Sequence, residues 1–358
     1  VTSPDNMAAS LVRSTLGCQF ARFLRPSLIT AAGQTQSQRG VKRYMRAYLK
    51  ELYNRRLRVG PEKLRHRSEF MNWNYDAEIY AFGKRLGEEF SNDSLQAAFT
   101  HRSYIEAEEA RRSDLGIDIA SAPLGLTDNS ELTQKGEETA SRYIKAYLRS
   151  TYPTMFEEAI VAIHDHLMSD DTLSHIASHI GIRDLMLCSD FPPEESTLSK
   201  NFLAVVGALE TDKGVKKAES LVRDLVLAQL VGKDLRELWS VTNPMGLLMA
   251  VLDSQGRGPP EPRLQWQAGQ RTIMAVYQVG IYSDKQLIGQ SAGERVTIAE
   301  DMAAQDALQR MMGIGSGHMP LTFRAEADKM ELRYDPKNIS AEELMQKYEQ
   351  RQKENSVS

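Results

Sequence analysis

Apolar residues recur at three- and four-residue spacing through most of residues 73–240, which predicts a succession of amphipathic helices. Asn92 and Asp93 are suitable N-terminal caps for one of these helices, and the Phe191-Pro192-Pro193 run interrupts the pattern between two others. We expect the helices over residues 75–90, 92–98, 129–152, 154–168, 170–181, 197–212 and 214–230. The pattern therefore predicts a mainly α-helical domain over residues 71–240.

The pattern changes after Asn243-Pro244, where a short helix over residues 244–253 is followed by a Gly- and Pro-rich loop. Alternating apolar and polar residues then predict three strands, and an Ala-rich stretch predicts a final helix. These four elements are expected over residues 263–266, 272–281, 286–291 and 298–311. The order αβββα predicts an α+β domain over residues 243–313.

Residues 320–358 form a charged C-terminal extension. Ser340 and Glu343 have the spacing of a capping box, which predicts a helix from there to about residue 354. Because this helix is polar nearly all round, we expect it either to dock on a partner or to remain solvated.

Charge is distributed unevenly along the chain, although the formal net charge is only −4. Residues 39–67 contain eleven Lys and Arg side chains and two Glu side chains, so the rest of the chain is strongly acidic. Cations neutralise phosphates, and the Tyr residues between them can stack on unpaired bases. Residues 39–70 are therefore interpreted as a basic RNA-binding arm, and a solvated helix face is the alternative. The cations assigned to binding are Lys42, Arg43, Arg46, Lys50, Arg55, Arg56, Arg58, Lys63, Arg65 and Arg67.

Residues 1–38 have the composition of a mitochondrial presequence. No acidic residue occurs from Met7 to Gln38, while Arg13, Arg22 and Arg25 lie among Leu, Ser, Thr and Ala. A disordered tail is the alternative. No apolar run approaches the roughly 18 residues of a membrane span, so none is expected. Two cysteines are too few for a disulfide framework or a zinc ribbon.

Three motifs in the helical domain resemble the ribonuclease III family. Residues 129–140, Asn-Ser-Glu-Leu-Thr-Gln-Lys-Gly-Glu-Glu-Thr-Ala, have the outline of its signature helix. Residues 97–104, Ala-Ala-Phe-Thr-His-Arg-Ser-Tyr, are similar to the element that precedes that helix. Residues 200–208, Lys-Asn-Phe-Leu-Ala-Val-Val-Gly-Ala, are similar to the segment that completes the family's metal site. The resemblance implies a ribonuclease III-like fold.

The chain departs from this family at three of the four positions where it places metal-binding carboxylates. Thr133, Lys200 and Leu203 occupy those positions, and Glu137 alone keeps an acid. A hard divalent cation needs anionic oxygen ligands, and Lys repels it. Glu131 and Glu138 lie about 100° per residue away from the required helix face. We therefore expect no catalytic residues, no metal, no cofactor and no enzymatic activity.

Four histidines in the helices after the signature motif offer another possible metal site. His164, His166, His175 and His179 have no nearby Cys and no zincin pattern, so structural or surface histidines are the preferred interpretation.

The second domain resembles a double-stranded-RNA-binding domain. Pro-Glu-Pro-Arg at residues 260–263 and Leu-Ile-Gly at residues 287–289 carry this resemblance. That family places a Lys pair at the start of its last helix, where this chain has Val296 and Thr297. Arg295 beside them and Arg271 in the first hairpin loop remain as RNA-binding candidates. Affinity for generic duplex RNA is expected to be poor.

The combination of these parts resembles a family of proteins of the mitochondrial large ribosomal subunit. Membership implies a structural role in the matrix, with mitochondrial rRNA and other large-subunit proteins as partners. The alternatives are a mitochondrial endoribonuclease and a non-ribosomal RNA-processing or RNA-binding factor. A homodimer is not expected, because Lys135, Glu137 and Glu138 on the signature helix would meet their own copies across a two-fold axis.

Overall fold

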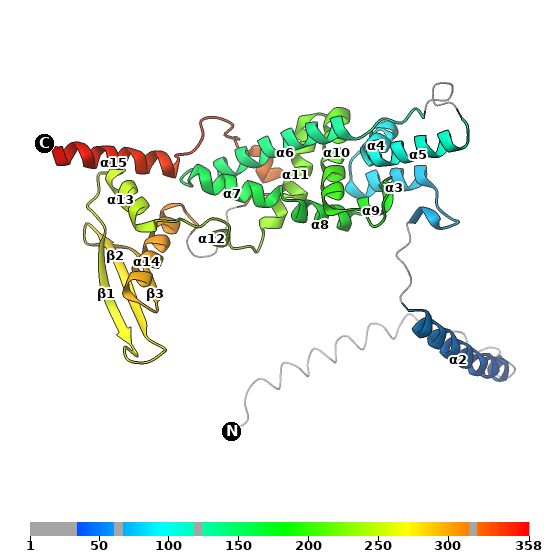
Figure 1. The fold of residues 1–358 in the computed structure, drawn as a ribbon, viewed down its shortest axis with the longest axis horizontal. Helices are drawn as coiled ribbons and strands as arrows, with labels where there is room; N and C mark the ends of the chain where they lie inside the picture. The colour runs from blue at the N-terminus through cyan, green and yellow to red at the C-terminus, as the bar shows by residue number, and fades with distance from the viewer. Residues whose placement is uncertain (1–33, 61–66, 118–123, 315–320, 358) are drawn as a thin grey trace. The chain divides into compact units, whose positions relative to one another are not determined.

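The computed structural model describes residues 34–60, 67–117, 124–314 and 321–357. The chain divides into two compact units, residues 1–64 and residues 65–358 (Figure 1). The predicted presequence lies outside the described residues, apart from residues 34–38.

The described residues of the first unit form a long helix, α2 (Gln34–Val59). The helix begins before the predicted boundary between residues 38 and 39 and runs through most of the predicted arm. From Met45 to Val59 every side chain except that of Asn54 is exposed. Its apolar side chains, such as Leu57 and Val59, are therefore not buried within the described part of this unit.

The first part of the second unit is helical, as predicted. It contains α3 (Tyr75–Leu86), α4 (Asn92–Phe99), α5 (Arg102–Asp114), α6 (Ser130–Thr151), α7 (Glu157–Leu167), α8 (Asp170–Ile180), α9 (Ile182–Leu185), α10 (Glu195–Lys213), α11 (Val215–Leu225) and α12 (Leu235–Leu238). Three short 3₁₀ turns lie elsewhere in the described unit: η3 (Arg67–Glu69), η4 (Leu227–Leu230) and η5 (Arg324–Lys329).

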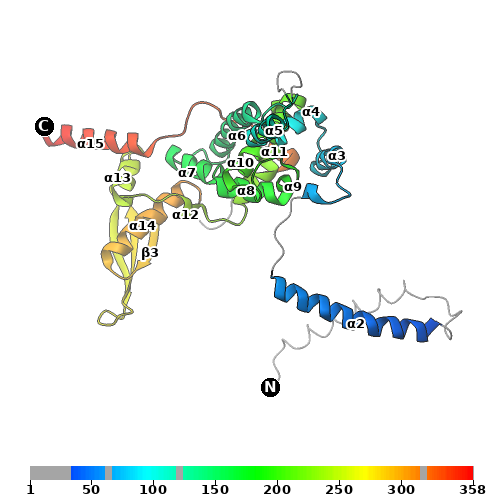
Figure 2. The ribbon, with the colours of Figure 1, turned by 45° about the vertical axis from the view of Figure 1, so that its right-hand side comes forward.

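Helix α10 is the centre of this helical domain. Its residues 201–209 are all buried, which explains why apolar residues occur on every side of the helix. Helices α4, α6, α8 and α11 pack around it (Figures 1 and 2). Residues 201–208 of the motif at 200–208 therefore lie in the middle of the core, directly against α6, the helix that carries the motif at 129–140.

The second domain has the predicted αβββα order. It consists of α13 (Pro244–Ser254), β1 (Glu261–Ala268), β2 (Val276–Ser283), β3 (Gln286–Gly293) and α14 (Val296–Met311). The strands form an antiparallel sheet in the order β1-β2-β3. Helix α14 packs on β2 and β3, and a Cβ built on Gly289 would lie 2.5 Å from the carbonyl oxygen of Ala303. The second strand begins four residues later than predicted, because residues 272–275 belong to the hairpin loop.

The first part of the C-terminal extension packs on the helical domain, which was not predicted. The helix that follows is mostly exposed, and its docking on a partner stays a prediction. Residues 321–340, here called the C-terminal strap, pack on α6, α7 and α11. Tyr147 Oη donates to the carbonyl oxygen of Thr322 at 2.6 Å, and Asn338 Nδ2 donates to those of Tyr152 and Met155 at 2.9 Å. Helix α15 (Ala341–Val357) then packs on α13.

The described helices include none that is both long enough and apolar enough to cross a membrane.

Candidate functional site

Two glycines allow the family-like helices α6 and α10 to cross with their backbones in contact. A Cβ on Gly136 would lie 2.0 Å from the carbonyl oxygen of Leu203, and one on Gly207 would lie 2.1 Å from that of Leu132. Real Cβ atoms do not approach that closely, so both positions require glycine. The crossing brings the two motifs, far apart in the sequence, into one site.

The four positions that correspond to the metal-binding carboxylates of the ribonuclease III family lie around this crossing. Thr133 Oγ1 donates to the carbonyl oxygen of Asn129 at 2.8 Å and lies 3.2 Å from that of Lys200. The Lys200 and Glu137 side chains are exposed, whereas Leu203 is only 6% exposed and belongs to the core. The site therefore combines one hydroxyl, one cation, one carboxylate and one buried apolar side chain.

The Thr-His-Arg-Ser element lies beside the crossing. His101 caps α5, and its Nδ1 lies 2.8 Å from Ser103 Oγ. Burial lowers the pKa of His101, and the Lys200 charge lowers it further. Asn129, at the start of α6, is buried and donates from Nδ2 to the carbonyl oxygen of Ala98 at 3.4 Å. Polar groups of all three motifs are thus held together.

The histidines do not assemble a metal site. His164 is buried between Ser141 Oγ and Asp165 Oδ1, each 2.9 Å from a ring nitrogen, and burial lowers its pKa. The rings of His175 and His179 lie 4.1 Å apart, tilted by 39°, and both residues are exposed. In the part of the chain that the structure describes, no three His, Cys, Asp or Glu side chains converge as metal ligands.

The predicted RNA-binding cations are divided between different elements. Arg46, Lys50, Arg55, Arg56 and Arg58 are exposed on α2. Lys42 and Arg43 belong to the same helix, where the described structure is limited to the backbone, and Lys63 and Arg65 lie outside the described residues. Arg55 Nε lies 3.8 Å from Glu51 Oε1. Because Glu51 is the one acidic residue in the sequence of α2, the helix remains strongly basic.

The remaining three predicted cations belong to the second unit. Arg67 pairs with Glu78 at 3.0 Å and lies over the Trp73 ring at 5.6 Å, so a contact within its own unit already engages it. Arg271 is exposed in the β1–β2 loop, and Arg295 is exposed at the N-cap of α14. Arg67 thus belongs to the helical part of this unit, and the other two belong to the second domain.

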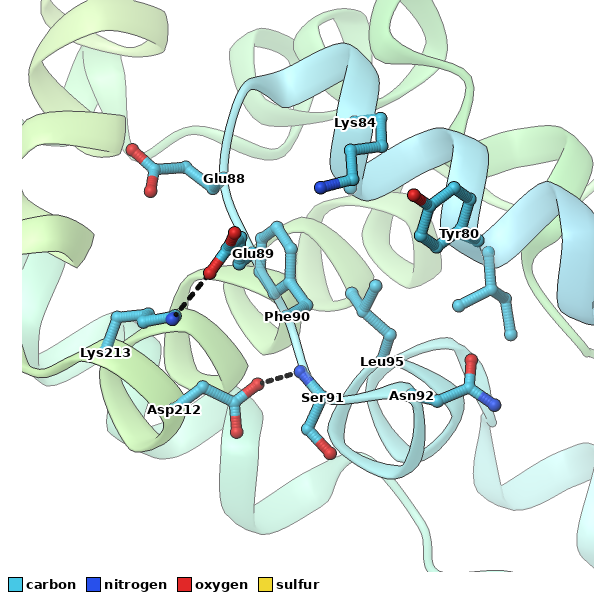
Figure 3. A pocket seen from close by; sticks show the side chains of 12 residues that line it. Tyr80, Lys84, Glu88, Glu89, Phe90, Ser91, Asn92, Leu95, Asp212 and Lys213 are labelled. Carbon is cyan, nitrogen blue, oxygen red and sulfur yellow. Dashed lines mark hydrogen bonds and ion pairs between the residues drawn. The ribbon is translucent and has the colours of Figure 1, made fainter.

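An open groove of about 500 Å³ between α3 and the C-terminus of α10 was not predicted. Figure 3 shows Phe90 at its centre, with Tyr80 and Lys84 on one side and the Glu89–Lys213 pair on the other. The pair has an Oε2–Nζ distance of 3.1 Å, and its hydrogen bond and charge lower the pKa of Glu89. No sequence motif marks this groove, because its lining comes from segments more than a hundred residues apart.

Comparison with known proteins identifies the family. The model of "Large ribosomal subunit protein mL44, endonuclease domain" matches residues 74–209, and that of "MRPL44 dsRNA-binding domain" matches residues 239–345. The chain is 37% identical over 305 residues to the large ribosomal subunit protein mL44 of Caenorhabditis elegans, an alignment that covers 83% of this chain and 75% of that protein. The chain belongs to the mL44 family of large ribosomal subunit proteins.

Members of the ribonuclease 3 family are similar over the same domains. The chain is 30% identical over 230 residues to ribonuclease 3 of Symbiobacterium thermophilum, which covers 62% of this chain and 90% of that enzyme. The nuclease domain of ribonuclease III from Campylobacter jejuni aligns with a TM-score of 0.34 at 19% identity, covering 41% of this chain and 95% of that one. The family resemblance predicted from the sequence is confirmed by the mL44 matches.

The C-terminal strap provides hydrogen-bond and ion-pair partners for two buried arginines of the helical domain, which was not predicted. Arg149 is buried, forms an ion pair with Glu157, and donates from Nη1 to the carbonyl oxygen of Tyr334 at 2.9 Å. Arg223, also buried, pairs with Asp328. An Arg on the buried face of a predicted helix needs a carboxylate or a carbonyl oxygen as its partner. The sequence alone does not identify which residue supplies it.

Proposed function

We propose that the chain is a structural protein of the mitochondrial large ribosomal subunit, in which a nuclease-like domain serves as a scaffold and cuts no RNA. Membership of the mL44 family carries this proposal. The basic α2 supports RNA as a partner, because its exposed cations can replace the counterions of phosphates. Other large-subunit proteins and the matrix are the expected surroundings.

The chemistry of the α6–α10 crossing supports the absence of catalysis. Ribonuclease III chemistry requires carboxylate oxygens around a divalent ion. Here Thr133 uses its hydroxyl for a backbone carbonyl, Lys200 brings a positive charge, and Leu203 fills the core. A single carboxylate, that of Glu137, cannot hold the ion against a neighbouring ammonium group.

Sedimentation tests the proposal directly. A mitochondrial extract is separated on a sucrose gradient, and fractions are probed for the chain and for large-subunit rRNA. We expect the two to co-sediment, and to stay together after a salt wash that removes loosely bound factors. A chain that remains near the top of the gradient would instead be a free RNA-processing or RNA-binding factor, and the proposal would be wrong.

A further inference from the structure

Strand β1 has an open edge. In the described residues it pairs with β2 and with no other strand, so one of its edges carries unpaired backbone N–H and C=O groups. Seven of its eight residues are exposed. Helix α14 covers β2 and β3 and leaves β1 outside this packing, so the strand is covered by helix on neither face.

The strand also exposes apolar side chains to both sides. Leu264 lies opposite Val279 and Trp266 lies opposite Gln278, and an irregularity between them breaks the register. Because Val279 and Gln278 are consecutive residues of β2, their side chains point to opposite faces. Leu264, 47% exposed, and Trp266, 55% exposed, therefore lie on opposite faces of the sheet.

The apolar surface continues to the end of the hairpin. Ile273 is 104% exposed and Met274 is 83% exposed in the β1–β2 loop, and Val276 follows at the start of β2. Long exposed edge strands with apolar side chains favour pairing with another chain unless charge or proline protects them. The charges of β1, Glu261 and Arg263, pair with each other at 2.7 Å and, together with Pro262, are confined to its first three residues, so residues 264–268 carry neither charge nor proline.

The chemistry of this edge favours a polypeptide over RNA. RNA is a polyanion, and a surface that binds it needs several cations. The hairpin from Glu261 to Ser283 carries two, Arg263 in β1 and Arg271 in the loop, and Arg263 is already paired with Glu261. An extended peptide satisfies a row of backbone donors and acceptors, and its alternating side chains reach both faces at once. A ligand on one face of the sheet would contact either Leu264 or Trp266 and would leave the edge unpaired.

We propose that β1 receives an additional strand from a neighbouring protein of the large subunit, with apolar side chains that pack on Leu264 and Trp266. This inference rests on the proposed ribosomal function and specifies one surface through which it is carried out.

Hydrogen exchange of the full chain, alone and within purified large subunits, tests the pairing. In the free chain the β1 amides that point away from β2 exchange rapidly, because nothing bonds them. If β1 pairs with another strand, its outward-pointing amides become hydrogen-bonded. In the subunit we therefore expect the amides of residues 261–268 to exchange at least about tenfold more slowly than in the free chain. A chain that fails to co-sediment with the subunit would overturn both proposals. A chain that co-sediments with β1 exchanging as fast as when free would overturn this one alone.

A photoreactive side chain at the exposed position 267 identifies the occupant. We expect one adduct in the intact subunit, to an extended segment of a ribosomal protein. An adduct to rRNA, or no adduct, would contradict the inference. Trp266→Ser should abolish both the adduct and the protection, whereas Val231→Ser, at a residue 63% exposed elsewhere, should leave both unchanged. Circular dichroism of the two free variants checks that each remains folded.

Discussion

At the scale of single residues, the glycines at the α6–α10 crossing decide whether the scaffold forms. Gly136→Ala places a methyl group into the backbone of α10, and the two helices must separate to admit it. We expect the free energy of unfolding to fall by about 1–3 kcal/mol or more, measured by urea denaturation. Gly83→Ala is the matched control, because its Cβ would meet its nearest neighbours at 3.4 Å, an ordinary contact. That variant should be neutral or more stable, because Ala favours helix over Gly by about 1 kcal/mol.

A second prediction at this scale concerns cleavage. The purified chain should not cut duplex RNA in Mg²⁺ beyond the level of a Glu137→Ala control, because Thr133, Lys200 and Leu203 remove the other ligand oxygens. Product formation is followed by gel electrophoresis of end-labelled RNA. Magnesium-dependent cleavage that disappears in Glu137→Ala would mean that the site still holds a metal.

At the scale of elements, α2 is expected to supply most of the salt-dependent RNA affinity. Replacing Arg46, Lys50, Arg55 and Arg58 with Gln should reduce the slope of log affinity against log salt concentration. Each lost phosphate contact contributes roughly 0.7–0.9 to that slope. Arg263→Gln is the control, because this cation is already paired with Glu261. A slope that is the same in both variants would identify the charged face of α2 as merely solvated.

The junction of the strap and α15 depends on one carboxylate. Burial raises the pKa of Glu158, but hydrogen bonds outweigh this effect and hold it below its usual value. They come from the Ala341 amide at 2.9 Å, the Ser340 hydroxyl at 2.5 Å and the Glu342 amide at 3.4 Å. Because the folded pKa is depressed, this contribution to stability is complete above the ordinary Glu pKa of about 4.5 and is lost as pH falls below it.

Glu158→Gln should therefore destabilise the chain at pH 7 by less than about 1 kcal/mol, because solvent screens the partly exposed carboxylate. The difference from wild type should shrink as the wild-type carboxylate becomes protonated. Urea midpoints at pH 7 and at pH values well below 4.5 measure the effect. Glu342→Gln, at an exposed position in the first turn of α15, is the control for loss of charge alone. An equal difference at both pH values would show that the carboxylate charge does not stabilise the junction.

The elements differ in how far the sequence could predict them. Seven helices of residues 75–230 and the αβββα order follow from apolar periodicity, whereas α5 and the four-residue α9 were not predicted. The close approach at Gly136 and Gly207 was not predicted either. The hairpin was misassigned because Thr272, Ile273 and Met274 have strand-like composition but lie in a loop. The strap was missed because Tyr147, Arg149 and Asn338 bond to backbone carbonyls, which every sequence offers equally.

At the scale of the whole molecule, we predict that the isolated chain is a monomer. Lys135, Glu137 and Glu138 are exposed on α6, and a two-fold axis along this helix would bring like charges together. Light scattering at micromolar concentration should give the mass of one chain. A stable dimer that dissociates when Glu137 and Glu138 are both replaced by Lys would contradict the expectation, since it would require this face to pair with itself.

The strap also has a consequence for biosynthesis. Because a chain is made from its N-terminus, residues 321–340 are synthesised only after both domains. Until they arrive, Arg149 and Arg223 lack the acceptors Tyr334 and Asp328, and the carbonyls of Tyr152 and Met155 lack Asn338. The helical domain therefore acquires its final contacts after the α+β domain has been translated. A chain truncated near residue 320 would keep the helices of both domains but would lack these hydrogen-bond and ion-pair partners. We expect quality-control proteases to degrade such a chain before it is incorporated into a ribosomal subunit.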